Sequence, residues 1–294
     1  MIIKQTTGGV ILVNQYEVLD IRSERFGGLE VLFPGWQPGD ERLCVYSPHD
    51  DDAILGAGYA MRAALDAGAE VDIIIVCSGD CGYSTPEEKD TIVARRHRET
   101  VNVYRAFGIP EANIHFLNYP DFSALSYVGR NISPTREGHF REVITLLRQR
   151  RITRILAPNH YHEHIDHLAA SMMAQFDAPQ AGDAHSVDWA DPYPVRSTAQ
   201  YSVWAELDPE DALVAGRDPR LRADTVLIAN ESVEQKVAQG LHEYESQQAI
   251  IADLMEQRKA RQLPDGRFIE VYRRFDPRPK LDFEPYKALL AKLK

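Results

Sequence analysis

The stretch Arg42-Leu-Cys-Val-Tyr-Ser-Pro-His-Asp-Asp-Asp52 joins an apolar run to a segment with helix-like periodicity. Its end places one imidazole and three carboxylates, at residues 49–52, directly after a predicted strand. In an open α/β sheet, ligands collect outside the carboxyl ends of the strands. The stretch therefore predicts both the class of fold and the place where its chemistry lies.

Apolar runs alternate with amphipathic segments in the part of the chain that follows residue 41. The pattern predicts strands at 42–47, 71–77, 113–118 and 153–157, and helices at 52–67, 88–107, 136–150 and 165–177. Short β-branched strands separated by helices are typical of βαβ units. We therefore expect an α/β fold with a Rossmann-like, mostly parallel sheet and helices on both faces. No G-x-G-x-x-G motif follows the first of these strands, which argues against a dinucleotide cofactor.

The two ends of the chain have a different character. Paired glycines and a Pro-Gly step punctuate β-rich pieces before residue 41, which predicts an N-terminal, hairpin-like β extension over residues 1–40. Residues 41–294 are then one domain, with a long surface loop at about 178–197. After that loop we expect strands at 198–206 and 224–229, one long helix over 232–261 with Ser232 as its N-cap, and a last strand in GRFIEVYRRF.

The composition excludes several classes of protein. The chain has 294 residues, 44% of them hydrophobic, and a formal charge of −11, which argues against a nucleic-acid or acidic-membrane binder. No signal peptide is recognised, and no apolar run reaches the ~18 residues that a membrane span needs. The three cysteines, Cys44, Cys77 and Cys81, do not suggest a disulfide framework. We expect a cytoplasmic protein.

A second cluster, His160-Tyr-His-Glu-His-Ile-Asp-His167, follows the strand predicted at 153–157 and holds four of the ten histidines. Because the carboxyl ends of neighbouring parallel strands share one edge of a sheet, both clusters are expected at the same edge. His49 and Asp52 are three residues apart at a strand-to-helix turn, so both side chains can face one point. With His167 as a third ligand they match a catalytic zinc site that keeps one position open for water.

The remaining side chains of the two clusters suit proton transfer. A metal acidifies a water and polarises a carbonyl, and Asp51 is the candidate general base that takes the proton of that water. His164 is placed to stabilise an oxyanion and to protonate a leaving nitrogen. Asp166 is a candidate for orienting an imidazole, as carboxylates behind metal sites commonly do.

Plainer interpretations exist for some of these residues. Acidic residues are ordinary at a helix start, and Asp50 alone is interpreted in that way. Three adjacent carboxylates repel one another unless a cation lies among them, which favours the metal site. His160 and His162 are equally well explained as surface residues. Together with Glu163 they leave a two-metal phosphoesterase as a minor alternative.

These residues resemble the LmbE/PIG-L family of zinc-dependent N-deacetylases. The family's His-Pro-Asp-Asp signature stands here as His49 to Asp52, with Asp50 in place of proline, and its His-x-Asp-His signature as His164 to His167. The resemblance implies zinc, or another divalent metal, held by His49, Asp52 and His167. It also implies Asp51 as the base, His164 as the electrophile or acid, and Asp166 as its acidic neighbour.

The resemblance extends to weaker features. Arg96, in an Arg-x-x-Glu on the helix after the second strand, and Asp121, shortly after the third, match family residues that contact the sugar. We also expect the 178–197 loop, through Trp189, Asp191 and Tyr193, either to supply contacts at the mouth of the site or to be a plain surface loop.

The resemblance implies a hydrolase that removes an acetyl group from an N-acetylated sugar or glycoside of the N-acetylglucosamine type. Alternatives are a metal-dependent amidase on a non-sugar amide and a non-catalytic metal-binding protein. The expected binding partner of the protein is then a small N-acetylated sugar or amide. The sequence does not decide whether the protein forms a homo-oligomer.

Overall fold

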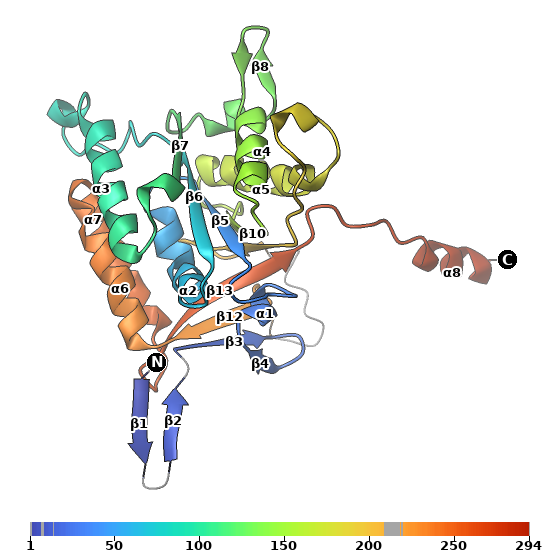
Figure 1. The fold of residues 1–294 in the computed structure, drawn as a ribbon, viewed down its shortest axis with the longest axis horizontal. Coiled ribbons are helices and arrows are strands. Elements are labelled where there is room, and N and C mark those ends of the chain that lie inside the picture. Colours follow the sequence, from blue (N-terminus) through green and yellow to red (C-terminus); the bar gives the residue numbers. More distant parts are fainter. Residues whose placement is uncertain (1, 7–8, 14, 209–217, 219, 294) are drawn as a thin grey trace.

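The computed structural model describes residues 2–6, 9–13, 15–208, 218 and 220–293. A nine-stranded sheet with the order β4-β3-β12-β13-β11-β10-β5-β6-β7 crosses the molecule (Figure 1). Five neighbouring strands are parallel: β11 (Ser197–Tyr201), β10 (Arg154–Pro158), β5 (Arg42–Ser47), β6 (Glu70–Cys77) and β7 (Ile114–Tyr119). The others pair antiparallel: β13 (Phe268–Phe275), β12 (Thr225–Ala229), β3 (Tyr16–Asp20) and β4 (Arg25–Gly27).

Helices cover both faces of the sheet because the parallel strands are apolar on both sides. In β5, Leu43 and Val45 belong to one hydrophobic cluster, and Cys44 and Tyr46 belong to another. The first cluster packs under α1 (Leu29–Leu32), α2 (Asp52–Asp66), α3 (Ile92–Phe107), α6 (Glu231–His242) and α7 (Gln248–Arg258). The second packs under α4 (Phe140–Gln149) and α5 (Ile165–Gly182). The predicted fold class is confirmed (Figure 1).

The segment before residue 41 contributes both to a separate hairpin and to the main sheet. The strands β1 (Ile2–Thr6) and β2 (Gly9–Val13) pair antiparallel with each other. The strands β3 and β4 instead extend the nine-stranded sheet at its edge, where β3 pairs with β12. Val18 and Leu32 are fully buried in the hydrophobic cluster that α2 also covers. The domain boundary at residue 40 stays a prediction.

The C-terminal third differs from the prediction in two places. The single helix expected over 232–261 is wrong, because residues 243–247 separate α6 from α7. Tyr244 lies in this break with its side chain fully buried, and its hydroxyl donates to the carbonyl oxygen of Asp50 at 2.7 Å. The N-cap of α6 is Asn230 and not Ser232. A straight helix would carry Tyr244 away from the turn that it contacts.

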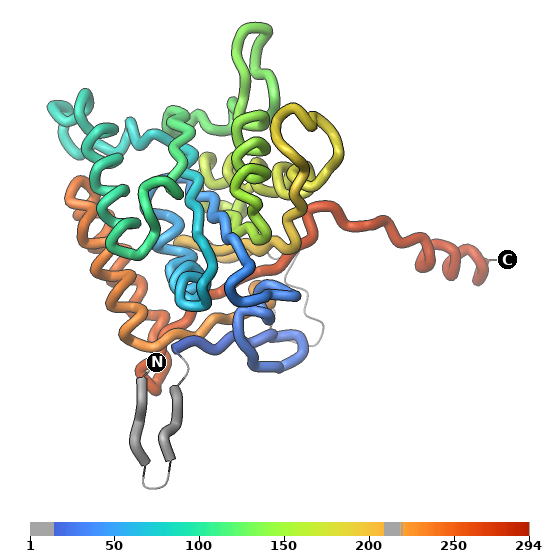
Figure 2. Tube along the Cα trace, in the orientation of Figure 1, coloured from blue at the N-terminus to red at the C-terminus, as the bar shows by residue number. Residues whose placement is uncertain are grey.

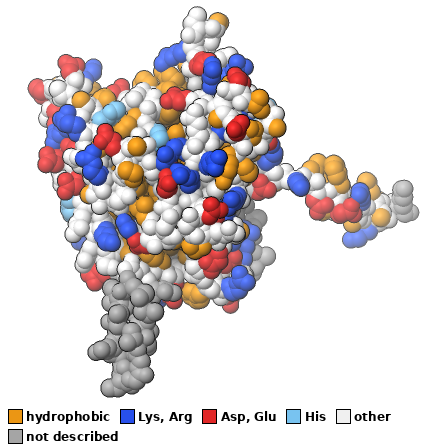
Figure 3. Space-filling view, in the orientation of Figure 1, with side chains coloured by type: hydrophobic (Ala, Val, Ile, Leu, Met, Phe, Trp, Pro, Cys, Tyr) orange, Lys and Arg blue, Asp and Glu red, His pale blue; other side chains and the backbone are white. Residues whose placement is uncertain are grey.

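Two short strands and a C-terminal helix lie outside the nine-stranded sheet and the helices that cover it. The strands β8 (Asn131–Ser133) and β9 (Arg136–Glu137) form a small antiparallel pair. Helix α8 (Glu284–Lys292) projects from the body at the end of the chain (Figure 2). Its exposed hydrophobic side chains include Leu289 and Leu290, and the space-filling view shows hydrophobic surface on this arm (Figure 3). Among the residues that the structure describes, no helix is both long and apolar enough to traverse a bilayer.

Candidate active site

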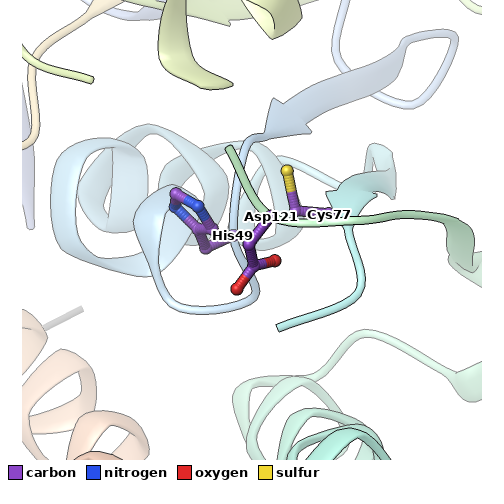
Figure 4. A group of neighbouring side chains, drawn as sticks. All are labelled: His49, Cys77 and Asp121. Carbon is purple, nitrogen blue, oxygen red and sulfur yellow. The ribbon is translucent and has the colours of Figure 1, made fainter. Parts of the chain in front are cut away.

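Residues from four parallel strands meet at the carboxyl edge of the sheet. His49, Asp51 and Asp52 follow β5, and His164 to His167 follow β10. Cys77 ends β6 and Asp121 follows β7, and both lie close to His49 (Figure 4). The structure thus brings together the two sequence clusters that the motif analysis singled out.

His49, Asp52 and His167 form a compact group of potential metal ligands. One ligand atom of each lies within 4.8 Å of those of the other two. The Oδ2 atom of Asp52 is 3.1 Å from Nδ1 of His49 and 3.2 Å from Nε2 of His167. Two imidazole nitrogens and one carboxylate oxygen are the ligand types of a three-residue catalytic zinc site. The backbone N–H of His49 also donates to Asp52 at 2.8 Å, which holds the turn that carries both ligands.

The electrostatics of this group favour a cation. Burial by itself disfavours a charged His49 ring, but the carboxylates of Asp166 and Asp52 raise the pKa of His49 well above its ordinary value. Against the same penalty of burial, Asp52 and Glu163 raise the pKa of His167 to about 9. Burial alone would raise the pKa of Asp52, yet the two histidines hold that pKa well below its usual range. A site that attracts protons so strongly also attracts a metal ion, which takes their place on neutral imidazoles.

An unsatisfied nitrogen supports this assignment. Nε2 of His167 is buried, and its 3.2 Å contact with Oδ2 of Asp52 does not have hydrogen-bond geometry, so among the described residues no hydrogen bond satisfies it. A buried polar atom without a partner is costly, and a metal ion at this point would satisfy it. The donor set therefore fits a divalent metal such as zinc.

A second group of possible ligands shares His49 and is less suited to a metal. It combines His49 with Cys77 and Asp121 (Figure 4). Burial raises the pKa of the Cys77 thiol to about 12, so the thiol is protonated at neutral pH. Asp121 already accepts the backbone N–H groups of Gly79 at 2.8 Å and Cys81 at 3.0 Å. We therefore assign the cation to the group that contains His167.

Glu163 fixes the orientation of the His167 ring, a role that the motif analysis missed. Its side chain is fully buried, and its Oε2 atom is 2.8 Å from Nδ1 of His167. Its other oxygen accepts the backbone N–H groups of residues 203–205 at 3.0–3.2 Å and the hydroxyl of Ser202 at 3.1 Å. A proton on Nδ1, shared with this carboxylate, leaves Nε2 free to face the metal. Only the spacing of Glu163 and His167, one helical turn apart, hinted at this pairing.

Asp51 lies at the start of α2, beside the ligands but outside their group. It is the N-cap residue of that helix and is 8% exposed. Burial and the neighbouring carboxylates of Asp52 and Asp50 raise the pKa of Asp51 to about 7. A carboxylate with a pKa near the working pH is suited to accept and return a proton.

His164 and Asp166 both lie close to His49. The His164 ring is 5.0 Å from the His49 ring, centre to centre, and its Nδ1 accepts the backbone N–H of Asp166 at 3.2 Å. Its neutral form then carries the proton on Nε2. Burial, reinforced by His49, lowers the pKa of His164. The Oδ2 atom of Asp166 is 3.6 Å from Nδ1 of His164 and 3.5 Å from Nε2 of His49, so this carboxylate lies between two histidines of the site.

Asp50 has a role that its position at a helix start does not reveal. The interpretation as an ordinary helix-start residue is wrong, because its carboxylate pairs with both Nε and Nη2 of the buried Arg96. Thr100 donates to the same carboxylate at 3.0 Å. The carbonyl oxygen of Asp50 accepts the hydroxyls of Tyr104 at 2.9 Å and Tyr244 at 2.7 Å. The turn that carries Asp51 and Asp52 is thereby tied to α3 and to the break between α6 and α7.

The substrate contacts inferred for Arg96 and Asp121 stay predictions. Arg96 is 5% exposed, and its guanidinium packs so closely against the 79–82 loop that a Cβ atom at Gly82 would clash with Nη1. Asp121 is 8% exposed and bonded to the same loop. Both residues support the wall of the site in this structure.

Other histidines and aromatic residues named from the sequence lie elsewhere. His160 is 3.6 Å from Asp208 and accepts from Gln200, and the His162 ring stacks on Tyr161. Neither histidine belongs to a group of potential metal ligands among the described residues. Trp189 is buried against Phe140, and Tyr193 lines a cavity with Arg42 at the amino end of β5. The loop after α5 therefore does not bring these two aromatic residues to the mouth of the site.

The fold and the site define an α/β protein with a group of three potential metal ligands, His49, Asp52 and His167, at the carboxyl edge of its sheet. Residues 44–175 match the family model PIG-L, described as GlcNAc-PI de-N-acetylase. This match confirms the resemblance to the LmbE/PIG-L family. A diacetylchitobiose deacetylase from Thermococcus kodakarensis is 24% identical over 168 residues, which are 54% of this chain and 58% of that protein. The match thus spans less than two thirds of that relative.

Solved structures agree on the fold. A diacetylchitobiose deacetylase from Pyrococcus horikoshii superposes with a TM-score of 0.59 at 20% identity, covering 85% of this chain and 90% of that one. A 4-carboxy-2-hydroxymuconate hydratase from Pseudomonas putida also gives a TM-score of 0.59 at 15% identity. This superposition covers 82% of this chain and 99% of the hydratase. Because one of these neighbours is a hydratase, the fold by itself does not decide the reaction.

Proposed function

We propose that this protein is a metal-dependent N-deacetylase that hydrolyses the acetamido group of an N-acetylated sugar or glycoside. The observation that carries the proposal is the group of His49, Asp52 and His167, with Asp51 and His164 beside it. A metal cluster flanked by a base and a hydrogen-bond donor is the equipment that amide hydrolysis requires.

His49, Asp52 and His167 hold the metal in this proposal, and zinc is the ion that suits their ligand atoms best. When bound, the metal supplies a Lewis acid that polarises the acetyl carbonyl and makes a water easier to deprotonate. Glu163 keeps Nε2 of His167 turned toward the ion. The carboxylate of Asp166, 3.5 Å from Nε2 of His49, orients the His49 ring.

Asp51 takes the proton of the attacking water. Its pKa of about 7 lets it hold that proton and then release it toward the leaving nitrogen near neutral pH. The lowered pKa of His164 keeps that ring neutral, so its Nε2–H donates a hydrogen bond to the oxyanion that forms when the carbonyl is attacked. Collapse of the tetrahedral species breaks the C–N bond and yields acetate and a free amine.

The substrate class rests on the relatives. The family model is described by the de-N-acetylation of GlcNAc-PI, and two relatives are named for diacetylchitobiose, so an N-acetylglucosamine unit is the common element. An amidase acting on a non-sugar amide uses the same catalytic groups and differs only in its substrate contacts.

The test is a screen for released amine over N-acetylglucosamine, N,N′-diacetylchitobiose, N-acetylated glycosides and simple acetamides, with metal supplied. We expect saccharide substrates to be cleaved and Asp51→Asn to lower kcat by 10²–10⁴-fold, about the contribution of a general base, with metal content unchanged. Asp253→Asn, the same change at an exposed position on α7, serves as the control and should retain wild-type kcat.

Three results would contradict the proposal in different ways. Cleavage of simple amides alone would favour the amidase. Stoichiometric metal binding without any turnover would indicate a metal-binding protein. Full kcat in Asp51→Asn would refute the assignment of the base.

A further inference from the structure

Two exposed aromatic side chains flank two histidines of the candidate site, His164 and His167. Phe122 is 61% exposed, and its ring centre is 4.9 Å from that of His164. Trp204 is 45% exposed, and its ring centre is 4.9 Å from that of His167. The His164 and His167 rings are themselves 5.7 Å apart, so the four rings form one continuous series across the site. Neither aromatic residue lies in a sequence motif.

Both aromatic residues are anchored to carboxylates that also hold site histidines. The backbone N–H of Phe122 donates to Asp166 at 2.6 Å, and Asp166 lies between His164 and His49. The backbone N–H of Trp204 donates at 3.2 Å to Glu163, the carboxylate that orients His167. The positions of the two rings are thereby set by the same groups that set the positions of the histidines.

The backbone of Phe122 is strained in a way that keeps its ring at the site. Its φ angle of +60° lies in the left-handed region, which a bulky side chain rarely adopts. Such a conformation is unfavourable for a bulky residue and persists only where the surrounding structure holds it. In this conformation the backbone N–H of Phe122 donates to the carboxylate of Asp166.

We propose that Phe122 and Trp204 form the aromatic walls of a saccharide subsite, which holds the pyranose ring that carries the acetamido group. A pyranose presents an apolar C–H face to an aromatic ring and hydroxyl groups at its edge. Binding pockets combine such aromatic walls with a few polar groups that fix the orientation. With the sugar held by these walls, its acetamido group lies over the metal cluster. This inference rests on the proposed deacetylase function and specifies its substrate contacts.

Trp204 allows binding to be measured apart from turnover. The sequence has three tryptophans, and the other two, Trp36 and Trp189, are each 8% exposed. In the metal-loaded Asp51→Asn protein, which is expected not to consume the substrate, we expect N,N′-diacetylchitobiose to change the tryptophan fluorescence in a saturable way. The change should be absent when Trp204 is replaced by alanine.

Kinetics test the same walls in the otherwise wild-type protein. Trp204→Ala and Phe122→Asn remove the rings, and asparagine tolerates the positive φ at position 122. We expect each variant to raise KM for the saccharide at least tenfold and to lower kcat less than threefold. For an acyclic acetamide, the fold rise in KM should be at least five times smaller than for the saccharide. Trp204→Tyr should recover most of the saccharide KM. Phe176→Ala, which removes a 58% exposed aromatic side chain on α5, is the control.

The outcomes separate the subsite from the proposed function. Saccharide cleavage with KM unchanged in both variants overturns the subsite and leaves the deacetylase standing. An equal rise in KM for saccharide and acyclic acetamide also overturns it, because the walls then do not recognise a sugar. A saturable fluorescence change without any cleavage supports the subsite and overturns the deacetylase. If there is no cleavage and no fluorescence change, both the subsite and the deacetylase are overturned.

Discussion

Glu163→Gln replaces one oxygen of the buried carboxylate beside His167 with an NH2 group of similar size. In the native protein five donors converge on this carboxylate: Nδ1 of His167, the hydroxyl of Ser202 and the backbone N–H groups of residues 203–205. Glutamine offers one acceptor oxygen to these donors. Four of the five surround Oε1, so we expect the amide oxygen to stay there and the NH2 group to face His167.

The consequence falls on the metal. An NH2 group beside Nδ1 needs that nitrogen to be an acceptor, which moves the imidazole proton to Nε2, the atom that faces Asp52 at 3.2 Å. Metal binding must then reverse the tautomer and leave a buried donor facing a donor. Loss of such an outer carboxylate typically weakens metal binding about 10–100-fold. This range corresponds to roughly 1.4–2.8 kcal/mol of binding free energy.

The assay is a titration of metal-free protein with Co²⁺, followed by its visible absorption, with a competing chelator to set the range. We expect the Kd of Glu163→Gln to rise 10–100-fold. Glu137→Gln, the same change on an exposed side chain of β9, should bind with wild-type affinity. Ser202→Ala removes one of the donors to the carboxylate and none to His167, and should change the Kd less than threefold.

Two results would contradict the role assigned to Glu163. If Glu163→Gln melts at the wild-type temperature and binds Co²⁺ with wild-type affinity, then Glu163 does not set the tautomer of His167. A rise in the Kd for Co²⁺ in Ser202→Ala equal to that in Glu163→Gln would also count against it. The loss of affinity would then come from the loop at residues 202–205 and not from the tautomer of His167.

Two further predictions concern stability. Burial raises the pKa of Glu270 from 4.5 to about 7, so the folded state holds this proton more tightly than the unfolded state, and stability is lost as the pH rises through that window. Between pH 4.5 and 7 the free energy of unfolding of the wild type should fall by at most roughly 3 kcal/mol because of this group, and Glu270→Gln should not show this fall. Urea denaturation of both proteins at each pH measures it. Parallel pH profiles would show that Glu270 does not titrate there. Asp50→Asn leaves the buried Arg96 without its counter-charge and should lower the free energy of unfolding by about 3–5 kcal/mol. The double variant with Arg96→Gln should recover part of this loss, and a loss below 1 kcal/mol in the single variant would show that the pair contributes little.

The elements with a strong local signal were predictable from the sequence. The strand ending at Ser47 matches its prediction, and the strand ending at Cys77 begins one residue earlier than predicted. Both could be predicted because short apolar, β-branched runs favour a strand buried on both faces. The break at Tyr244 was not predictable from periodicity, because apolar residues continue at helical spacing on both sides of it. The buried contact with Asp50, almost two hundred residues away in the chain, decides that the helix stops there.

The candidate site was predictable to the level of its residue types. The two motifs name His49, Asp52 and His167 without a structure, because few structural reasons place these residues directly after strands. The partners of Asp50 and Glu163 were not predictable. Arg96 lies on another helix, and the amides that hold Glu163 belong to a loop forty residues further along the chain. Hydrogen bonds to backbone N–H groups leave no signature in side-chain identity.

The sequence by itself determined the class of fold and the residue types of the candidate metal ligands, because local hydrophobic periodicity and short motifs carry both. Only the tertiary structure decided which carboxylate does what. Asp50 becomes the counter-ion of Arg96, Asp51 remains outside the ligand group with a raised pKa, and Asp52 lies between two imidazoles. Three adjacent aspartates are chemically alike in a peptide. Burial and the charges brought beside each of them by distant segments make them different.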